Sequence, residues 1–396
     1  MTPRRTGRPT RVRRPALPGH AVGVPPSGSS PLLLAVDGDS LLHRAHHAMA
    51  GSDQRDTEGR PAWALRGLVS FIATAAARLT PDALVVGFDS REHSVRRTEH
   101  PEYKAQRAEK HPDLSEQLEA APGLLTAAGV SVVVRSGYEA DDVLASAAAL
   151  ARRGRWRCIL VTSDRDSFAL IDDTTSVLRV LNGGLGDSPV LTPATLEAIC
   201  GVPPARYREL AALRGDPSDN LPGVVGIGSK IAARLMAAFP GIDALYAALD
   251  GDRRADVVDV VGEVLADRLA EGPSREAVRR NLALMLMHDD LRMPSLRRSA
   301  LPLDAVRMRS ALTARGIGLG PSLWALVGEP APAWLQSGYD RAPGYLPRVE
   351  PSQLAALSLT VPPSPPGSGV AVAARPAPAR RRRPPVVVPE TQLSLF

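Results

Sequence analysis

Short apolar runs alternate with longer amphipathic stretches along the first half of the chain. Runs of four to six mainly apolar residues, bounded by polar positions, are typical of buried parallel strands. We expect strands at Leu32 to Val36, Ala83 to Phe88, Ser131 to Val134 and Arg157 to Thr162, and helices at 61–78, 113–127 and 139–152. Strands that alternate with helices predict an α/β fold, with a mainly parallel sheet flanked by helices.

After about residue 190 the apolar positions follow a helical period. We expect helices at 193–200, 204–213 and 229–238, and a mainly helical region from about 255 to 328. Both ends of the chain are rich in proline and arginine, a composition that buries too little apolar surface to fold. The expected organisation is a largely disordered basic tail over 1–31, an α/β core over 32–190, a helical subdomain over 191–328 and a second, largely disordered tail over 329–396.

The charge is unevenly distributed. The 396-residue chain has a net charge of +6, but residues 1–31 carry +6 and residues 330–396 carry +4, which leaves 32–329 at −4. A basic chain suggests a polyanionic partner. Here the folded body is mildly acidic, so a nucleic-acid partner fits only if the acids are gathered to hold metal ions.

The sequence excludes several classes of protein. No run approaches the ~18 apolar residues of a membrane helix, and Leu32 to Val36 is too short for a secretory signal. Cys158 and Cys200 stand in no zinc or disulfide spacing and are expected in the core. We therefore expect no membrane partner and a location in the cytoplasm, associated with the nucleoid.

Carboxylates stand directly after several predicted strands. Ligands of open α/β sheets bind beyond the carboxyl ends of the strands. Like charges gathered there raise one another's pKa unless cations neutralise them, and oxygen ligands without His or Cys favour Mg²⁺ or Mn²⁺. A lone aspartate after a strand is usually a cap, but capping does not explain several separate clusters. The acids are Asp37, Asp89, Glu139, Asp141, Asp142, Asp164, Asp166, Asp216 and Asp219.

The combined motifs resemble the 5′-nuclease domain found at the N-terminus of bacterial DNA polymerase I, in the flap endonuclease superfamily. They run in the family's order over about 32–328, three quarters of the chain. The matching motifs are Val36-Asp37-Gly38 with Arg44, Phe88-Asp89, Arg96, Tyr103 to Arg107, Tyr138 to Asp142, Thr162 to Asp166, Gly215 to Gly223 and Gly226 to Lys230.

This resemblance implies hydrolysis of phosphodiesters by two divalent metal ions, Mg²⁺ or Mn²⁺. It implies that the first ion is held by Asp37, Asp89, Glu139 and Asp141. It assigns to the second ion Asp141, Asp142, Asp164, Asp166 and Asp219, with Asp216 in an outer shell.

The resemblance also makes residues 91–115 an arch through which a single strand passes. Tyr103, Lys104 and Arg107 lie there at helical spacing, suited to stacking on a base and gripping the scissile phosphate. Arg44 and Arg96 are the other expected phosphate ligands. Where the family often has aromatic residues, this chain has Ala45-His46-His47 and Val95, so its substrate preference is open.

A glycine-rich segment resembles the family's helix-three-turn-helix element, which is related to the helix-hairpin-helix. Its residues Gly223, Gly226, Gly228, Ser229 and Lys230 are expected to contact duplex phosphates without reading sequence. In relatives this loop binds K⁺ through carbonyl oxygens, which here belong to Leu213, Arg214, Pro222, Val224 and Ile227.

The last five residues, Gln392, Leu393, Ser394, Leu395 and Phe396, match the peptide with which bacterial proteins dock on the β sliding clamp. Leu395 and Phe396 would fill an apolar pocket. Accidental similarity remains an alternative for so short a motif.

We therefore expect a monomeric, freestanding 5′ nuclease with exonuclease or flap endonuclease activity, in DNA repair or Okazaki-fragment processing. Two alternatives stay open: a non-catalytic protein that binds DNA junctions, and a PIN-like RNase. None of the nine carboxylates is missing, which disfavours the first, and the glycine segment with Lys230 disfavours the second. The sequence leaves open the preference for exonuclease or flap substrates and for RNA or DNA strands.

Overall fold

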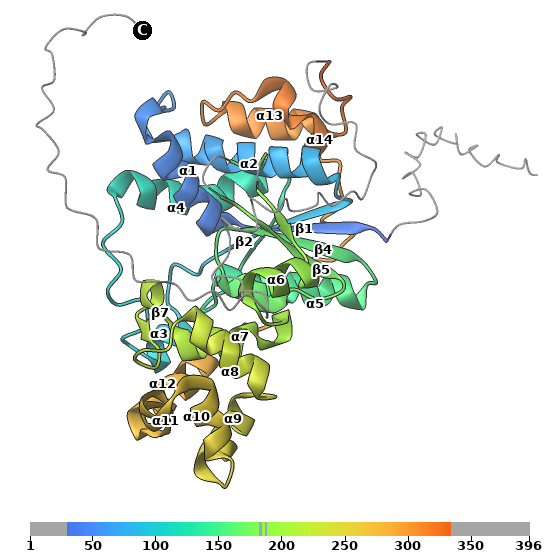
Figure 1. Ribbon diagram of the computed structural model, residues 1–396. Coiled ribbons are helices and arrows are strands. Elements are labelled where there is room, and N and C mark those ends of the chain that lie inside the picture. The colour runs from blue at the N-terminus through green and yellow to red at the C-terminus, as the bar shows by residue number, and fades with distance from the viewer. Residues whose placement is uncertain (1–29, 182–183, 187, 334–396) are drawn as a thin grey trace, which may run out of the picture. The chain divides into compact units, whose positions relative to one another are not determined.

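A six-stranded sheet with the strand order β3-β2-β1-β4-β5-β6 forms the centre of the fold (Figure 1). The computed structural model describes residues 30–181, 184–186 and 188–333. Neighbouring strands are parallel except for β5 and β6, which are antiparallel. The strands are β1 (Leu32–Asp37), β2 (Ala83–Phe88), β3 (Ser131–Val134), β4 (Arg157–Thr162), β5 (Thr175–Arg179) and β6 (Val190–Leu191). The predicted α/β class and its four strands are confirmed; β5 and β6 were not predicted.

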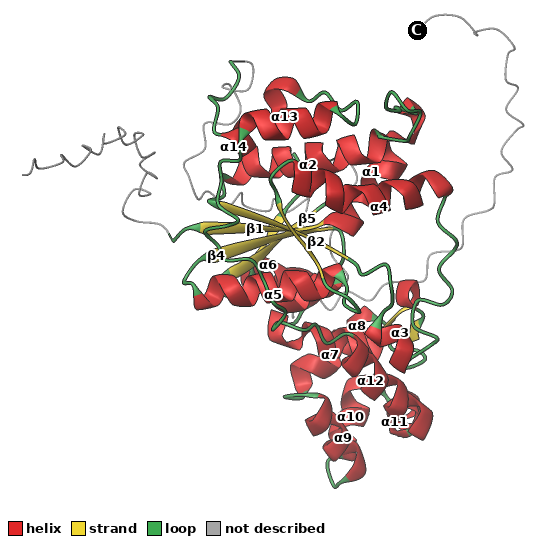
Figure 2. Cartoon of the chain, turned by 180° about the vertical axis from the view of Figure 1, so that it is seen from behind, coloured by secondary structure: helices red, strands yellow, loops and turns green. Residues whose placement is uncertain are grey.

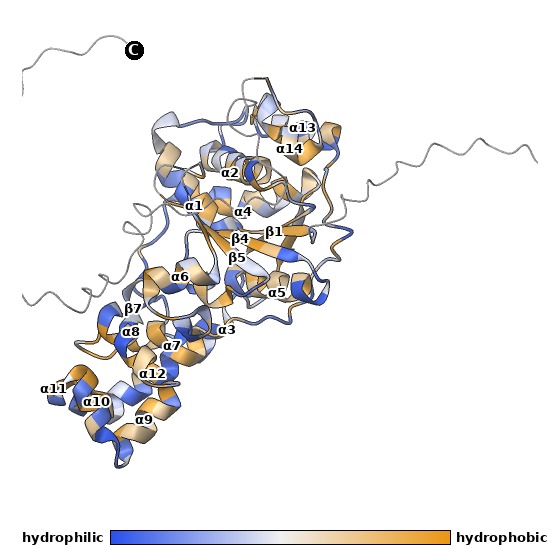
Figure 3. Cartoon of the chain, turned by 45° about the vertical axis from the view of Figure 1, so that its right-hand side comes forward, coloured by the Kyte–Doolittle hydropathy of each residue, from blue (hydrophilic) through white to orange (hydrophobic). Residues whose placement is uncertain are grey.

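Helices cover both faces of the sheet, as Figure 2 shows. Side chains alternate between the two faces of a strand. Leu34 of β1 therefore packs with the helices α1, α2 and α4, and its neighbour Leu33 packs with the helices of the opposite face. In Figure 3 the strands β1 and β4 are coloured mainly as hydrophobic. The flanking helices are α1 (Gly38–Met49), α2 (Trp63–Leu79) and α4 (Pro112–Ala127) on one face, and α5 (Ala140–Arg153) and α6 (Pro193–Cys200) on the other.

A helical part follows the sheet in the chain. It packs against the core through α7, which contacts the short 3₁₀ helix η2 (Asp166–Leu170), with the rings of Phe168 and Tyr207 5.3 Å apart. Within the described residues no single helix is long and apolar enough to cross a membrane, although α8 and α9 together, bent by 79°, meet that criterion. The helices are α7 (Pro204–Arg214), α8 (Ser229–Ala238), α9 (Ile242–Asp250), α10 (Arg254–Val261), α11 (Glu263–Ala270) and α12 (Gly272–Leu284).

The last described helices pack on the core, whereas the predicted helical subdomain, 191–328, included them. Helices α13 (Ala305–Thr313) and α14 (Trp324–Val327) pack on α4 and α2, not on the helical part. The returning segment is tied to β2, because Leu84 donates a backbone hydrogen bond to the carbonyl of Ser299. Burial of Leu312 and Leu326 against the outer side of the core accounts for this return.

A glycine controls the turn from β1 into α1. A Cβ on Gly38 would lie 2.4 Å from a ring carbon of Phe88, which is fully buried. We predict that Gly38→Ala lowers the free energy of unfolding by about 1–3 kcal/mol through overpacking. Gly123→Ala, in α4 with open space around it, is the matched control and should be neutral or stabilising by up to about 1 kcal/mol. Urea denaturation measures both, and equal effects would contradict this packing argument.

Candidate active site at the carboxyl edge of the sheet

The carboxyl ends of three adjacent strands bring predicted acids together. Asp37 ends β1, Asp89 follows β2, and Asp164 follows β4 by two residues. Because β2, β1 and β4 are neighbours in the sheet, these residues lie at one edge. A cavity of about 340 Å³ opens there, and its acidic lining consists of Asp37, Asp39, Asp89, Asp141 and Asp164.

Asp37 is held by the elements on either side of it. Its Oδ1 accepts a hydrogen bond from the backbone of Ser40 at 2.9 Å, and its Oδ2 accepts one from the Thr162 hydroxyl at 2.8 Å. Burial, with the nearby charges of Asp39 and Asp89, raises the pKa of Asp37 to about 8. The carboxylate is therefore fixed in place but short of positive charge.

Asp89 connects the edge of the sheet to α5. Its Oδ1 accepts a hydrogen bond from the backbone of Ala140, at the start of that helix, at 2.8 Å. Its own amide donates to Asp39 Oδ2 at 2.7 Å. Asp39 was not among the predicted site residues, and its only local signal was its position two residues after Asp37, in the first turn of α1.

Asp141 and Asp166 crowd the same region. Burial, together with Asp164 and Asp37, raises the pKa of Asp141 well above its usual value. Burial and Asp164 also raise the pKa of Asp166 to about 8. Within the described residues the Oδ1 atoms of Asp141 and Asp166 are buried without a hydrogen-bond partner. Such an oxygen is costly unless a cation pairs with it.

In the part of the chain that the structure describes, no three acid, His or Cys side chains stand close enough together to hold a metal ion. Two cations lie among the carboxylates: Lys104 Nζ is 2.8 Å from Glu139 Oε2, and an Arg107 nitrogen is 2.6 Å from Asp219 Oδ1. The all-oxygen donor set and the two unpartnered oxygens nevertheless fit a hard divalent cation, which would replace these basic groups as counter-charge.

The expected arch is built differently from the prediction. Residues 91–115 contain the short helix α3 (Val95–Glu99), then turns, then the start of α4. Lys104 has a φ of 57°, so the predicted helical spacing of Tyr103, Lys104 and Arg107 is not realised. The Tyr103 ring is buried, with its hydroxyl 3.2 Å from Glu139 Oε2 and 3.1 Å from Asp219 Oδ2. Its ring is therefore not open to stack on a base in this arrangement.

Arg96 and Asp142 also differ from the prediction, which made one a phosphate ligand and the other a metal ligand. They form a buried bidentate ion pair, with nitrogen-to-oxygen distances of 2.8 and 2.7 Å. Although burial alone would raise the pKa of Asp142, the hydrogen bonds from Arg96 hold it below its usual value. The reason for the difference is that each residue satisfies the other's charge inside the protein.

Basic residues line the same cavity as the acids. Arg44, predicted as a phosphate ligand, is one of them, together with Lys104 and Arg107. His43, His47 and Lys110 also line it and were not predicted. Burial, with the charge of Lys110, lowers the pKa of His43 to about 4, so His43 is neutral at physiological pH.

The glycine-rich segment forms the expected tight turn before a helix. It follows the short strands β7 (Gly215–Asp216) and β8 (Leu221–Pro222), which are separated by the 3₁₀ helix η3 (Pro217–Asp219). A Cβ on Gly223 would lie 2.3 Å from the backbone of Arg214, and Gly226 has a φ of 89°, so both positions require glycine. Gly228 caps α8, Ser229 begins it, and Lys230 is exposed.

The remaining predicted residues have these positions. Asp216 Oδ1 accepts hydrogen bonds from the amide and hydroxyl of Ser218, as the cap of η3. Among the carbonyls predicted for K⁺, those of Leu213 and Val224 each accept one backbone hydrogen bond, and that of Pro222 accepts one from Asn281. The predicted docking peptide, Gln392 to Phe396, lies outside the described residues.

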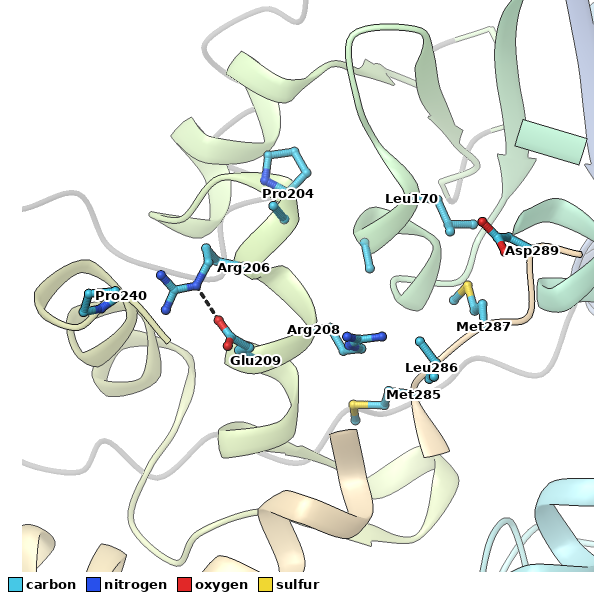
Figure 4. Close-up of a pocket in the computed structure, with 12 residues that line it drawn as sticks. Leu170, Pro204, Arg206, Arg208, Glu209, Pro240, Met285, Leu286, Met287 and Asp289 are labelled. Atoms are coloured by element: carbon cyan, nitrogen blue, oxygen red, sulfur yellow. Dashed lines mark hydrogen bonds and ion pairs between the residues drawn. The ribbon is translucent and has the colours of Figure 1, made fainter. Parts of the chain in front are cut away.

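A second cavity, of about 350 Å³, lies between η2, α7 and residues 285–289 (Figure 4). Apolar side chains such as Leu170 and Met287 share its lining with Arg206, which is ion-paired with Glu209. None of the nine predicted metal carboxylates lines this cavity. The acidic cavity at the edge of the sheet is therefore the candidate active site.

A mainly parallel sheet, an edge of crowded carboxylates and basic side chains among them define a class, the metal-dependent nucleases. Residues 32–198 match the family description "5′-3′ exonuclease, N-terminal resolvase-like domain", and residues 202–302 match "5′-3′ exonuclease, C-terminal SAM fold". The chain is 36% identical over 311 residues to the 5′-3′ exonuclease of Streptomyces coelicolor, covering 74% of this chain and 98% of that protein. The chain therefore belongs to the 5′-3′ exonuclease family.

Two other relatives define the extent of the match. DNA polymerase I of Mycobacterium tuberculosis is 32% identical over 242 residues, which are 61% of this chain. The match spans about a quarter (26%) of that polymerase's length. Among solved structures, that of the T5 D15 protein co-crystallised with metal ions has the same fold, with a TM-score of 0.50, 20% identity, and coverage of 75% of this chain and 97% of that one.

The raised carboxylate pKa values predict how stability depends on pH. Folding raises the pKa of Asp37 and Asp166 from 3.8 to about 8, so the folded state binds protons more tightly than the unfolded state. In EDTA the free energy of unfolding should therefore fall, by on the order of 1 kcal/mol or more, as the pH rises from 5 to 8. Mn²⁺ added at pH 8 should restore it.

Chemical denaturation at each pH measures this effect. The double variant Asp37→Asn/Asp166→Asn is the matched control, and it should show a flatter pH dependence and a smaller gain from Mn²⁺. A wild-type stability in EDTA that rises or stays level between pH 5 and 8 would refute this account of the site.

Proposed function

We propose that this protein is a structure-specific 5′ nuclease that hydrolyses DNA phosphodiesters near 5′ ends or at 5′-flap junctions, in repair or Okazaki-fragment processing. The observation that carries the proposal is the acidic cavity, which is lined both by carboxylates from the ends of three strands and by Arg44, Lys104 and Arg107. The acids suit metal ions, and the bases suit a phosphate backbone.

Two Mg²⁺ or Mn²⁺ ions would be held by these carboxylates and would supply a low-pKa water and charge stabilisation for phosphodiester cleavage. We assign Asp37, Asp89, Glu139 and Asp141 to one ion, and Asp141, Asp164, Asp166 and Asp219 to the other. Asp142 is not a ligand of the second ion in this assignment, because Arg96 already neutralises its charge. Thr162 and Ser40 orient Asp37, and Ala140 orients Asp89, so the protein itself holds these oxygens in place.

The arch segment would hold the substrate strand. A cavity of about 450 Å³ adjoins the acidic cavity, and the two share Asp89, Lys104, Arg107 and Lys110 as lining residues. A single strand lying along both would pass these basic side chains. Lys104 and Arg107, now paired with Glu139 and Asp219, would exchange carboxylate partners for the scissile phosphate.

The duplex next to the cleavage site would bind at the glycine-rich turn. The backbone amides at the start of α8 and the exposed Lys230 present positive charge without any means of reading bases. A carbonyl oxygen has two lone pairs, so it can accept a hydrogen bond and also bind a cation. The carbonyls of Leu213, Pro222 and Val224, at this turn, would bind K⁺ in this way.

Replacing Asp141 tests the proposed chemistry. We predict that Asp141→Ala reduces Mg²⁺-dependent cleavage of a 5′-flap substrate by at least about a thousandfold and leaves junction binding within about threefold, because it removes a ligand of both ions. Asp243→Ala, an exposed acid at the start of α9, is the control and should cleave normally.

Cleavage of 5′-flap, nicked, blunt and RNA-primed duplexes should be compared in Mg²⁺ and in EDTA. Normal turnover by Asp141→Ala would reject the mechanism. Wild-type binding without cleavage would favour the non-catalytic junction protein, and cleavage of single-stranded RNA alone would favour a PIN-like RNase.

We further propose that Gln392 to Phe396 dock on the β sliding clamp, through Leu395 and Phe396. Deleting residues 392–396 should abolish retention on immobilised clamp and leave cleavage of naked DNA unchanged. Leu395→Ala/Phe396→Ala should reproduce the loss, and Thr391→Ala, just before the motif, should not. Undiminished retention after the deletion would end this proposal.

A further inference from the structure

Arg96 and Asp142 join three segments that are distant in the sequence. Arg96 lies in α3 within the arch segment, and Asp142 lies in the first turn of α5. The third is the connecting segment, residues 284–291, which leaves the end of α12. Arg96 Nε donates to the carbonyl of Leu284 at 2.9 Å, and another Arg96 nitrogen donates to that of Leu286 at 2.8 Å.

Arg96, Asp142 and the connecting segment form a contact within the protein that we call the α3–α5 junction. All the acceptor sites of the Asp142 carboxylate are used in it. Besides the two bonds from Arg96, its Oδ1 accepts from the backbone of His288 at 2.9 Å and its Oδ2 accepts from the backbone of Glu139 at 3.0 Å. A carboxylate offers about four lone-pair sites, and all four are taken. Asp142 is also fully buried, so neither a metal ion nor a phosphate has access to it.

The next turn of α5 holds the connecting segment a second time. The Ser146 hydroxyl donates to the carbonyl of His288 at 3.1 Å and accepts from the amide of Leu291 at 3.0 Å. Residues four apart lie on one face of a helix, so Asp142 and Ser146 form one continuous contact with the segment. The connecting segment is thus attached along α5 through its backbone.

The same network extends to both functional parts. Towards the glycine-rich turn, the buried Asn281 of α12 donates to the carbonyls of Ala212 and Pro222, both at 3.0 Å. Towards the acidic cavity, an Arg96 nitrogen lies 3.6 Å from Glu139 Oε2, and Asp142 holds the Glu139 amide. A short series of bonded and hydrogen-bonded residues therefore connects the glycine-rich turn with Glu139, a candidate metal ligand.

We propose that Arg96 and Asp142 are positioning residues: they keep the helical part that bears the glycine-rich turn in one fixed relation to the Glu139 end of α5. A duplex bound at the turn then presents its scissile phosphate at the acidic cavity. This inference rests on the proposed nuclease function, and it replaces direct substrate or metal contact as the role of these two residues. Misplacing the reacting groups costs rate without weakening binding.

The test uses Arg96→Lys, which keeps the charge but loses the planar fork, Asp142→Asn, which keeps the shape, and the double variant. On a 5′-flap substrate in Mg²⁺, each should lower kcat by about tenfold or more with KM within about threefold of wild type. The kcat of the double variant should lie within about threefold of the kcat of either single variant, because each single substitution already disrupts the same α3–α5 junction. Arg309→Lys is the control: one Arg309 nitrogen contacts both carboxylate oxygens of Glu329 on the surface, and this variant should behave as wild type.

Two measurements without catalysis complete the test. In EDTA, hydrogen exchange of the amides of His288 and Leu291 should accelerate by about tenfold or more in each junction variant and not in Arg309→Lys. Mn²⁺ titration should find the same number of bound ions in Asp142→Asn as in wild type. Should Asp142→Asn fail to fold, Arg96→Lys carries the exchange and kinetic measurements alone, because it leaves no unpaired charge.

Three results would overturn the proposal. Loss of one bound Mn²⁺ in Asp142→Asn alone would make Asp142 a metal ligand. A raised KM with unchanged kcat in Arg96→Lys would make Arg96 a substrate ligand. Unchanged exchange at His288 and Leu291 would show that the pair does not hold the connecting segment. If the wild-type protein cleaved no substrate, the proposed function would fail, but the exchange and Mn²⁺ results would still decide whether the junction exists.

Discussion

Repulsion between carboxylates at one edge of a parallel sheet is the constraint on which this structure depends. The strand order places Asp37, Asp89 and Asp164 side by side, and burial removes the water that would screen their charges. Lys104 and Arg107 form ion pairs with Glu139 and Asp219 and thereby offset part of the negative charge. The arch segment is therefore shaped by the electrostatics of the site beneath it, which explains why its residues turn instead of forming a helix.

Two adjacent acids at the start of α5, Asp141 and Asp142, differ in their hydrogen-bond partners. Asp141 keeps a buried oxygen without a partner, whereas Asp142 has every lone pair satisfied by Arg96 and two backbone amides. The first arrangement is costly and suits an ion that arrives from solution; the second is complete in the protein alone. In the proposed mechanism the same helix start serves chemistry through Asp141 and attachment of the helical part through Asp142.

Much of this could be predicted because the signals are local. Apolar runs identified β1 to β4, and the glycines at 223 and 226 indicated a turn that only glycine can form. The unpredicted strand β6 has a weak signal because it has only two residues. Helices α13 and α14 lie in the region that was expected to be helical, but their pattern does not reveal which part of the protein they pack on. Asp39 was overlooked because its role depends on Asp89 and Arg91 coming close in space.

The fold class, the family and most of the acids at the sheet edge could be predicted from the sequence, because strand periodicity and residue identity are properties of short segments. The availability of each carboxylate depends instead on the tertiary fold. Asp142 and Asp141 are adjacent and chemically identical, and what distinguishes them is that Arg96, 46 residues before Asp142, reaches one and not the other. Likewise the hydroxyl of the buried Tyr103 donates to Glu139 and Asp219, residues far from it in the chain. A side chain's charge partner is set by long-range packing, and that information is absent from any local pattern.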